Sequence, residues 1–105
     1  MSTPYWIPVA ELAEVQAREV MPVSADGHDL ALYCVDGRVY CTANLCTHGN
    51  AFLSEGFLID AEIECPLHQG RFDVRTGQPT CPPACEALRV YPVTVEGGRV
   101  CVELS

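Results

Sequence analysis

The chain has 105 residues, which is enough for one domain with a single hydrophobic core and too few for two. Hydrophobic residues make up 49% of it and charged residues 19%, a composition typical of globular proteins and not of disordered ones. Fourteen acidic and six basic residues give a formal net charge of −8, which argues against nucleic acid or an anionic membrane as a partner.

No hydrophobic stretch approaches the ~20 residues needed to span a membrane, and the first residues lack the basic and apolar regions of a secretory signal. We therefore expect a soluble protein of the cytoplasm. The seven cysteines are an odd number, and a reducing compartment disfavours disulfides. Some of these cysteines are therefore expected to bind metal.

The N-terminal part predicts one short helix and two β-hairpins. Residues 9–17 have the composition of a helix of one or two turns. Asp26-Gly27 and Asp36-Gly37 each lie between alternating apolar residues, which is a strong signal for a tight hairpin turn. The second turn places two sets of residues on opposite faces of its hairpin: Leu30, Leu32, Cys34, Val39 and Cys41 on one, and Ala31, Tyr33, Val35 and Tyr40 on the other.

The C-terminus predicts a further hairpin, and the middle of the chain predicts a loop-rich insertion. The expected turn is Gly97-Gly98, and one face of this hairpin is hydrophobic: Tyr91, Val93, Val95, Val100, Val102 and Leu104. Residues 43–86 are rich in Cys, His, Gly and Pro and include a hairpin-like segment that turns at Asp60. These features predict an all-β fold, a small antiparallel sandwich or barrel, in one domain that spans residues 1–105 with a subdomain at about 43–86.

Two cysteine–histidine pairs lie in that insertion. The stretch "LCTHGN" contains Cys46 and His48, and "ECPLHQG" contains Cys65 and His68, whereas His28 lies beside a turn and is expected to be exposed. Two thiolates and two imidazoles suit zinc or iron. Zinc modules usually pair like ligands on one turn, but here each loop offers one cysteine and one histidine. That pattern fits a binuclear cluster in which the cysteines bind one iron and the histidines the other.

The motifs C-x-H and C-x-x-H resemble the signature of Rieske [2Fe-2S] proteins, and the similarity extends over most of the chain. It includes "LALYCVDGRVYCTANLCTHG", "HQGRFDVRTGQPTCPPA" and the final hairpin. The sequence is most similar to the small ferredoxins of bacterial aromatic-ring dioxygenase systems. This resemblance implies the Rieske fold and one [2Fe-2S] cluster, bound by Cys46, His48, Cys65 and His68.

A ferredoxin of this kind is an electron carrier and not an enzyme. The resemblance implies transient contacts with a flavin-containing, NAD(P)H-dependent reductase as electron donor and with a terminal oxygenase as acceptor. It implies no direct small-molecule substrate. Two alternatives stay open: the small Rieske subunit of an assimilatory nitrite reductase, and a zinc-stabilised interaction module without a redox role.

The resemblance also suggests where the partners bind. The rim of the docking face would consist of residues beside the two histidines: Gly49, Asn50, Gln69 and the Pro82-Pro83 segment. Acidic residues close in sequence to the loops would attract a basic partner surface: Glu55, Asp60, Glu62, Glu64 and Glu86.

Rieske proteins of respiratory complexes have a disulfide and two hydroxyl groups near the cluster, and this sequence lacks both. The disulfide positions hold Ala51 and Leu67, and the hydroxyl positions hold Gly70 and Phe72. Rieske potentials range from about −150 to +300 mV. Because the missing donors would favour the reduced cluster, we expect a potential at the low end of that range.

Packing is the favoured interpretation for four of the five cysteines outside the two motifs. Cys34 and Cys41 are predicted to pack as small apolar residues, and Cys101 is predicted to face outward. Cys81 and Cys85 flank a pair of prolines, where packing is the favoured interpretation over a redox or extra-ligand role.

Overall fold

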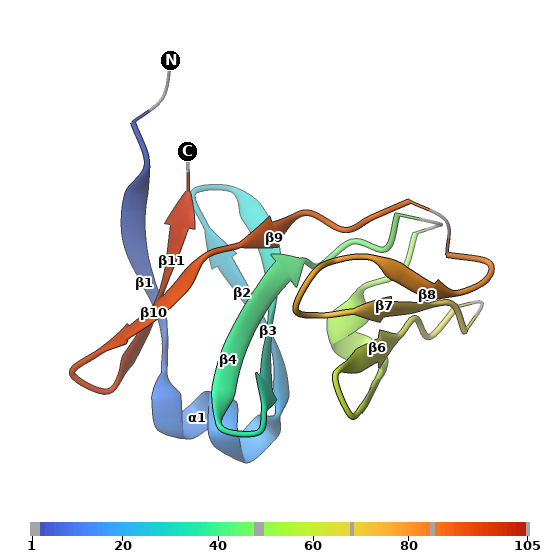
Figure 1. Cartoon of the computed structure of the whole chain (residues 1–105). Coiled ribbons are helices and arrows are strands. Elements are labelled where there is room, and N and C mark those ends of the chain that lie inside the picture. Colours follow the sequence, from blue (N-terminus) through green and yellow to red (C-terminus); the bar gives the residue numbers. More distant parts are fainter. Residues whose placement is uncertain (1–2, 48–49, 68, 85, 105) are drawn as a thin grey trace.

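Two antiparallel sheets form one end of the molecule, which we call the base (Figure 1). The computed structural model describes residues 3–47, 50–67, 69–84 and 86–104. One sheet has the strand order β1-β11-β10 and the other the order β2-β3-β4-β9. The strands are β1 (Tyr5–Glu11), β2 (Val20–Ala25), β3 (His28–Val35), β4 (Arg38–Ala43), β9 (Val90–Tyr91), β10 (Val93–Glu96) and β11 (Arg99–Leu104). The helix α1 (Leu12–Arg18) connects β1 to β2.

The remaining part of the chain, residues 44–88, lies beside the base, and we call it the loop half (Figure 1). It contains a third antiparallel sheet with the order β5-β6-β7-β8. Its elements are a short 3-10 helix (Leu53–Glu55), β5 (Phe57–Ile59), β6 (Glu62–Glu64), β7 (Arg71–Asp73) and β8 (Pro79–Cys81). The predicted antiparallel all-β fold is therefore confirmed.

The tight turns lie where the sequence predicts them. Asp26 and Asp36 have positive φ angles of 49° and 50°, and each is followed by a glycine with a φ of 80°. This pattern of two successive positive φ angles is the geometry of a type I′ hairpin turn. The register of β3 and β4 pairs Leu32 with Cys41, as the Asp36-Gly37 turn requires. Asp60 likewise lies in the turn between β5 and β6, with a φ of 54°.

The segment that includes β9 and β10 connects the two sheets of the base. Tyr91 in β9 pairs with Cys41 in β4, and after Pro92 the chain continues as β10, in which Val93 pairs with Val102 of β11. Proline lacks a backbone N–H, so it suits the point at which a strand leaves one sheet for the other. Tyr91 and Val102 nevertheless contribute to the same core.

Strand β3 separates two hydrophobic cores. Leu30 and Leu32 belong to the core of the base, together with Val100 and Val102. Ala31 and Tyr33 on the opposite face belong to the core of the loop half, which we call the second core. All four of the β3 residues from Leu30 to Tyr33 are fully buried. A strand that is covered on both faces needs apolar residues at consecutive positions, as this one has. The two faces predicted for this hairpin thus become parts of two different cores.

Inside the second core, the hydroxyl groups of Tyr33 and Thr42 form a hydrogen bond of 2.9 Å. Burial raises the pKa of Tyr33 far above its usual value, so this side chain is neutral at any physiological pH. Thr42 also donates a hydrogen bond to the carbonyl of Ala43. These bonds satisfy the polar atoms where the loop half packs on the base.

The N-terminal helix was predicted wrongly at its start. Residues 9 to 11 end strand β1, and the helix begins only at Leu12. The pairing of β1 with β11 continues to Glu11, opposite Arg99, and holds this segment in an extended conformation. Pro8 lies where the register shifts, and proline inside a run disfavours a strand assignment, so the sequence did not predict β1.

One expectation about the C-terminal hairpin was wrong, and another is confirmed. Val95 was placed on the core face, but its side chain is 41% exposed because β10 is an edge strand and Val95 lies near its end at the Gly97-Gly98 turn. Cys101 lies on the opposite face of β11 from the buried Val100 and Val102, as predicted, and it is half-buried between Pro8 of β1 and Thr94 of β10.

No helix in the described ranges is long and apolar enough to cross a membrane.

Candidate metal centre

The first cysteine–histidine motif lies in a closed loop that we call loop 1, residues 46–51. The N–H of Cys46 donates a hydrogen bond of 2.8 Å to the carbonyl of Ala51, and the N–H of Leu53 donates one of 2.8 Å to the carbonyl of Asn44. These two bonds form a short antiparallel ladder at the base of the loop. Cys46 is only 4% exposed at this ladder, which places its sulfur inside the loop half.

The second motif lies in a matching loop, which we call loop 2, residues 65–70. The N–H of Cys65 donates a hydrogen bond of 2.8 Å to the carbonyl of Gly70, and that of Gln69 donates one of 3.0 Å to the carbonyl of Cys65. Cys65 is 2% exposed. Each loop therefore begins with a buried cysteine. The N–H of this cysteine donates a hydrogen bond to the carbonyl of the residue five positions later in the chain.

A third segment, residues 81–86, contacts both loops. A Cβ atom at Gly70 would lie 2.9 Å from the backbone nitrogen of Ala84, so only glycine allows loop 2 to approach this segment so closely. The hydroxyl of Thr47 in loop 1 donates a hydrogen bond of 2.8 Å to the carbonyl of Glu86. Neither contact could be predicted from the sequence, because both depend on tertiary packing.

The chemistry of the four predicted ligands suits an iron–sulfur cluster. Thiolates bind iron strongly, and the two cysteines lie buried among the hydrophobic side chains of the second core. His48 and His68 lie outside the described residues. The described residues include only two of the four predicted ligands, and among them no group of three His, Cys, Asp or Glu side chains lies close enough together to hold a metal ion.

The four positions at which the sequence predicts a missing disulfide and missing hydroxyl groups have side chains without a hydroxyl group. Phe72 is fully buried in the second core, and Gly70 is buried against Ala84. Leu67 in loop 2 is 51% exposed, and Ala51 closes the ladder of loop 1. None of these four residues has a side chain that can donate a hydrogen bond to a cluster sulfur.

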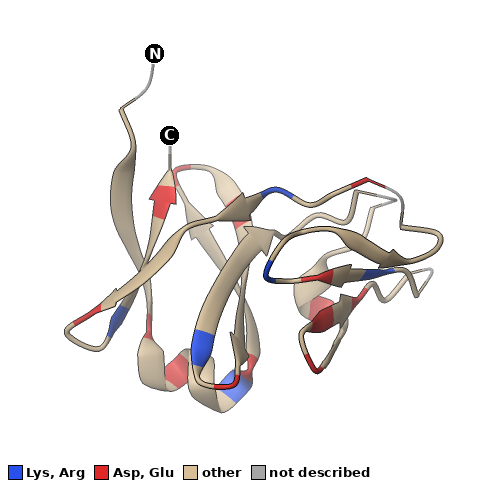
Figure 2. Ribbon diagram, viewed as in Figure 1, with Lys and Arg blue, Asp and Glu red and all other residues tan. Residues whose placement is uncertain are grey.

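Charges in the loop half are predominantly acidic (Figure 2). It contains six acidic residues and two arginines, and both arginines form ion pairs. Arg71 lies 3.1 Å from Glu64 and 3.9 Å from Glu62. Two of the five acids that we expected to attract a partner are thus already paired, because β6 and β7 are neighbouring strands.

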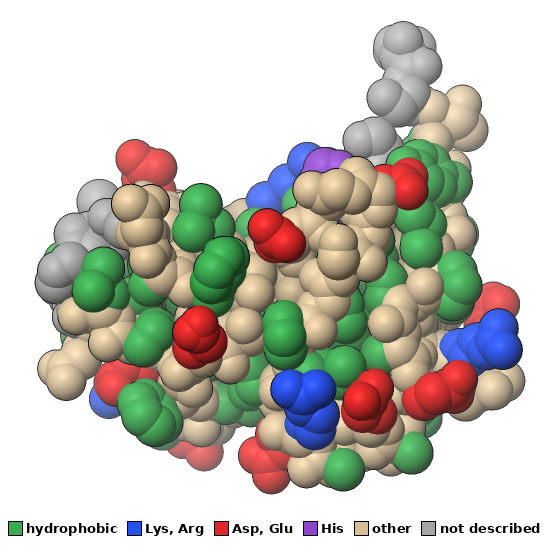
Figure 3. All heavy atoms as spheres, turned by 180° about the vertical axis from the view of Figure 1, so that it is seen from behind, with side chains coloured by type: hydrophobic (Ala, Val, Ile, Leu, Met, Phe, Trp, Pro, Cys, Tyr) green, Lys and Arg blue, Asp and Glu red, His purple; other side chains and the backbone are tan. Residues whose placement is uncertain are grey.

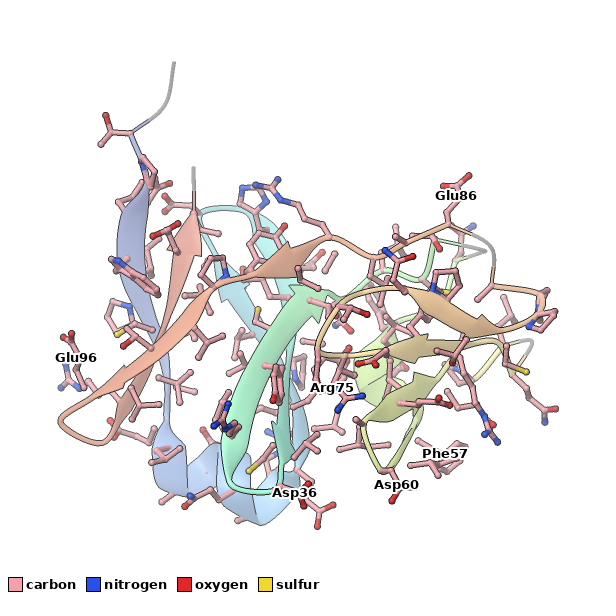
Figure 4. The ribbon with its side chains drawn as sticks, in the orientation of Figure 1. Asp36, Phe57, Asp60, Arg75, Glu86 and Glu96 are labelled. Carbon is pink, nitrogen blue, oxygen red and sulfur yellow. The ribbon has the colours of Figure 1, made fainter. Side chains whose placement is uncertain are left out.

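The other three expected acids have no ion pair among the described residues: Glu55, Asp60 and Glu86. All three are exposed. Figure 4 shows Glu86 at one edge of the loop half and Asp60, near Phe57, at the opposite edge. Their negative charge is therefore available to a partner from more than one side.

Arg75 forms a two-pronged contact with Asp73. Its Nε lies 3.0 Å from Asp73 Oδ1, and its terminal nitrogen lies 2.9 Å from Oδ2. This hydrogen-bonded contact lowers the pKa of Asp73 and raises that of Arg75. Arg75 points into the gap between the two halves (Figure 4), where Asp36 and Tyr40 of the base add to its stabilisation as a cation.

The described cysteines outside the motifs agree in part with expectation. Cys41 is buried, and burial raises the pKa of its thiol to about 12, so it is unreactive at neutral pH. Cys34 is half-buried against the core of the base, and Cys81 is half-buried at the end of β8. Cys85 lies outside the described residues. His28 is exposed, as predicted.

Comparison with known proteins identifies the family. Residues 5–92 match the Rieske [2Fe-2S] domain. The chain belongs to the Rieske [2Fe-2S] domain family. Its cofactor is therefore one [2Fe-2S] cluster, and the zinc-stabilised interaction module is no longer a tenable alternative.

Several relatives of this Rieske protein are ferredoxins. The ferredoxin component of the naphthalene 1,2-dioxygenase system of Pseudomonas aeruginosa is 52% identical over 98% of this chain and 99% of its own length. The solved ferredoxin of Sphingomonas yanoikuyae B1 is 40% identical, with a TM-score of 0.91 over 96% of this chain and all of that one. A ferredoxin solved in complex with the oxygenase of carbazole 1,9a-dioxygenase is 41% identical, with a TM-score of 0.87 over 92% of this chain and 91% of that chain.

A nitrite reductase small subunit is more distant. The protein of Mycobacterium tuberculosis described as the small subunit of an NADH-dependent nitrite reductase is 21% identical, with a TM-score of 0.86 over 99% of this chain and 98% of that chain. At such low identity the similarity shows a shared fold alone.

Proposed function

We propose that this protein is a one-electron carrier of an aromatic-ring dioxygenase system, working in the cytoplasm. It receives electrons from an NAD(P)H-dependent flavin reductase and passes them to a terminal oxygenase. The observation that supports this best is whole-length identity of 52% to a ferredoxin component of such a system. The related ferredoxin solved with an oxygenase supports the second partner.

The four motif residues bind the cluster: Cys46, His48, Cys65 and His68. The two cysteines, which are buried at the bases of loops 1 and 2, would hold one iron. The histidines, which the sequence places inside the same loops, would hold the other. When bound, the cluster accepts and releases one electron at a time. We regard residues 43–86 as the cluster-binding subdomain of a single domain that spans residues 1–105.

The surrounding residues exclude water and provide no catalytic site. Four protein ligands would complete the coordination of the two irons and would leave no position open for oxygen or a substrate. Ala84 packs against Gly70 at the end of loop 2, and Phe72 lies in the hydrophobic core next to this loop. These residues keep the cysteine side of the site dry, which also influences the reduction potential.

The histidine side of the site forms the docking face. Asn50, Gln69 and Pro82 are exposed around the two loops, and Gly49, which we also assign to this face, lies outside the described residues. A carrier must release one partner before it binds the next, so contacts at this face are expected to be small and transient.

The reduction potential tests the assignment as a ferredoxin of this kind. Because neither Gly70 nor Phe72 has a hydroxyl group to donate, we predict a reduction potential at the low end of the Rieske range, about −150 mV. Spectroelectrochemical titration of the purified holoprotein measures it. A midpoint well above zero would contradict the prediction.

Reconstitution tests the whole proposal. The holoprotein is mixed with the reductase and the oxygenase of the naphthalene 1,2-dioxygenase system, NADH and naphthalene, and product formation is followed. We expect turnover only when all three proteins are present. A nitrite reductase catalytic subunit serves as the control acceptor, and electron transfer to that subunit but not to the oxygenase would refute the proposal.

A further inference from the structure

Two large hydrophobic side chains lie next to each other on the outside of loop 1. Leu45 and Phe52 face each other across the ladder as an antiparallel pair. The hydrogen bonds lie on either side of this pair and not within it, which is the arrangement that brings opposite side chains closest. Leu45 is 50% exposed and Phe52 43%, whereas the neighbouring Cys46 and Leu53 are buried.

The exposure of this pair is not required by the fold. In an extended ladder, side chains alternate between faces, and polar residues at these two positions would leave both buried neighbours in place. Adjacent exposed hydrophobic residues on a soluble protein commonly mark a binding surface. The pair lies next to Cys46, so a partner bound here would be close to the cluster loops.

Unpaired acids flank the hydrophobic pair. The N–H of Glu55 bonds to the carbonyl of Phe52 at 3.1 Å, and the carbonyl of Glu86 accepts the hydrogen bond from Thr47, two residues beyond Leu45. Neither glutamate has an ion pair among the described residues. On the face seen in Figure 3, acidic side chains of the loop half stand among hydrophobic ones, and a basic side chain is visible only at the edge of that half.

The cations near this surface are already engaged. Arg71 and Arg75 are paired with acids of β6 and β7, and the guanidinium of Arg89 lies 4.8 Å from the centre of the Tyr91 ring, towards the base. The surface is therefore a hydrophobic centre with a negative border. Its complement is a hydrophobic depression bordered by lysine or arginine side chains.

We propose that Leu45 and Phe52, bordered by Glu55 and Glu86, form a docking site for the terminal oxygenase. We call these four residues the Leu45–Phe52 patch. This inference rests on the proposed function and extends the docking face from the tips of the loops to the outer side of loop 1. The hydrophobic pair supplies most of the affinity, and the two acids accelerate association with a basic surface.

Substitution of the hydrophobic pair tests the site. Phe52→Ser and Leu45→Ser holoproteins are compared with the wild type for binding to the oxygenase of the naphthalene 1,2-dioxygenase system, by calorimetry. We expect an increase in Kd of about tenfold for each variant. Val95→Ser is the matched control, because Val95 is 41% exposed in the base, and it should leave the Kd unchanged. Visible absorbance and Tm verify that every variant contains the cluster and is folded.

Substitution of the acids tests the border. Glu55→Gln and Glu86→Gln should reduce the salt dependence of the association rate with the oxygenase, measured by stopped flow. Glu96→Gln is the control, since Glu96 lies at the opposite end of the molecule in the β10–β11 hairpin (Figure 4). An identical salt dependence in all four proteins would overturn the role of the acids.

The remaining outcomes separate this site from the proposed function. Wild-type protein that transfers no electrons to the oxygenase would refute the function itself and the site with it. A functional wild type with unchanged affinity in both serine variants would overturn only the site. An equal loss of binding to the reductase would show a shared docking face and contradict the assignment to the oxygenase. A dimer of the wild type that both serine variants abolish, seen by sedimentation, would assign the patch to contact between copies instead.

Discussion

Strands in the base run for up to eight residues, whereas each of the four strands in the loop half has three. The glycines of the two halves differ in the same way. A Cβ atom at Gly27 or Gly37 in the base would contact nothing within 4 Å. In the loop half, a Cβ at Gly56 would lie 2.0 Å from the carbonyl oxygen of Glu64, and one at Gly77 would lie 2.3 Å from that of Leu88.

This difference shows that the halves are stabilised by different means. Long ladders and alternating apolar residues are sufficient for the base, in which glycines serve only to form turns. The loop half has short ladders, so we expect close approach of backbone segments, ion pairs and the cluster that we propose it binds to contribute more of its stability. We therefore expect the cluster, at the site that we propose, to stabilise the loop half more than the base.

The largest expected effect comes from removal of the cluster. Cys65→Ser, or treatment of the wild type with an iron chelator under reducing conditions, should abolish the visible absorbance and increase hydrogen exchange at Ile63 and Phe72 in the loop half. Amides of Leu32 and Val102 should keep most of their protection, because the base has its own core. Hydrogen exchange measured by NMR distinguishes the two cores, and equal changes in both would contradict the comparison.

A pair of glycine substitutions should have the next largest effect. Gly27 and Gly77 have the same φ of +80°, but only Gly77 lies against another backbone segment. Gly27→Ala should therefore cost only the left-handed conformation, about 1–2 kcal/mol. Gly77→Ala should cost about 1–3 kcal/mol more, because the chain near Leu88 must move. Urea unfolding of the two variants measures the difference, and equal free energies of unfolding would argue against close packing in the loop half.

The ion pair of Arg75 with Asp73 should have the smallest effect. Since the pKa of Asp73 is lowered in the folded state, its contribution to stability is present above its unfolded pKa of about 4 and is lost as the pH falls through the lower folded value. Asp73→Asn should thus destabilise the protein at pH 7, by roughly 0.5 kcal/mol, and differ little from wild type in strong acid. The Tm measured as a function of pH tests this, and a difference that persists at low pH would assign the effect to packing.

The sequence was sufficient to predict the features that depend on local patterns. Turns at Asp26-Gly27, Asp36-Gly37 and Gly97-Gly98 could be predicted because each needs residues that tolerate a positive φ between apolar runs. Strand β1 was not predicted, because Pro8 inside the run disfavours a strand assignment. The pairing of this segment with β11 holds it as a strand, and that pairing cannot be read from the local sequence. The exposure of Val95 also depends on which strands are neighbours, and no local pattern contains that information.

In the candidate site, spacing was sufficient for the cysteines but not for their surroundings. The C-x-H and C-x-x-H motifs predicted two similar loops, and both begin with a buried cysteine at a ladder. The contact of Gly70 with Ala84 and that of Thr47 with Glu86 join residues 14 and 39 positions apart, and no pattern in the sequence indicates them. The assignment of His48 and His68 as ligands remains a prediction.

Electron paramagnetic resonance of the reduced protein, labelled with ¹⁵N-histidine, tests that assignment most directly. We predict a rhombic spectrum with hyperfine coupling to two histidine nitrogens, one lost in His48→Cys and the other in His68→Cys. His28→Gln should leave both couplings unchanged, because His28 packs edge-on against Tyr91 in the base. A spectrum without histidine coupling, or one that His28→Gln alters, would contradict the proposal that Cys46, His48, Cys65 and His68 bind the cluster.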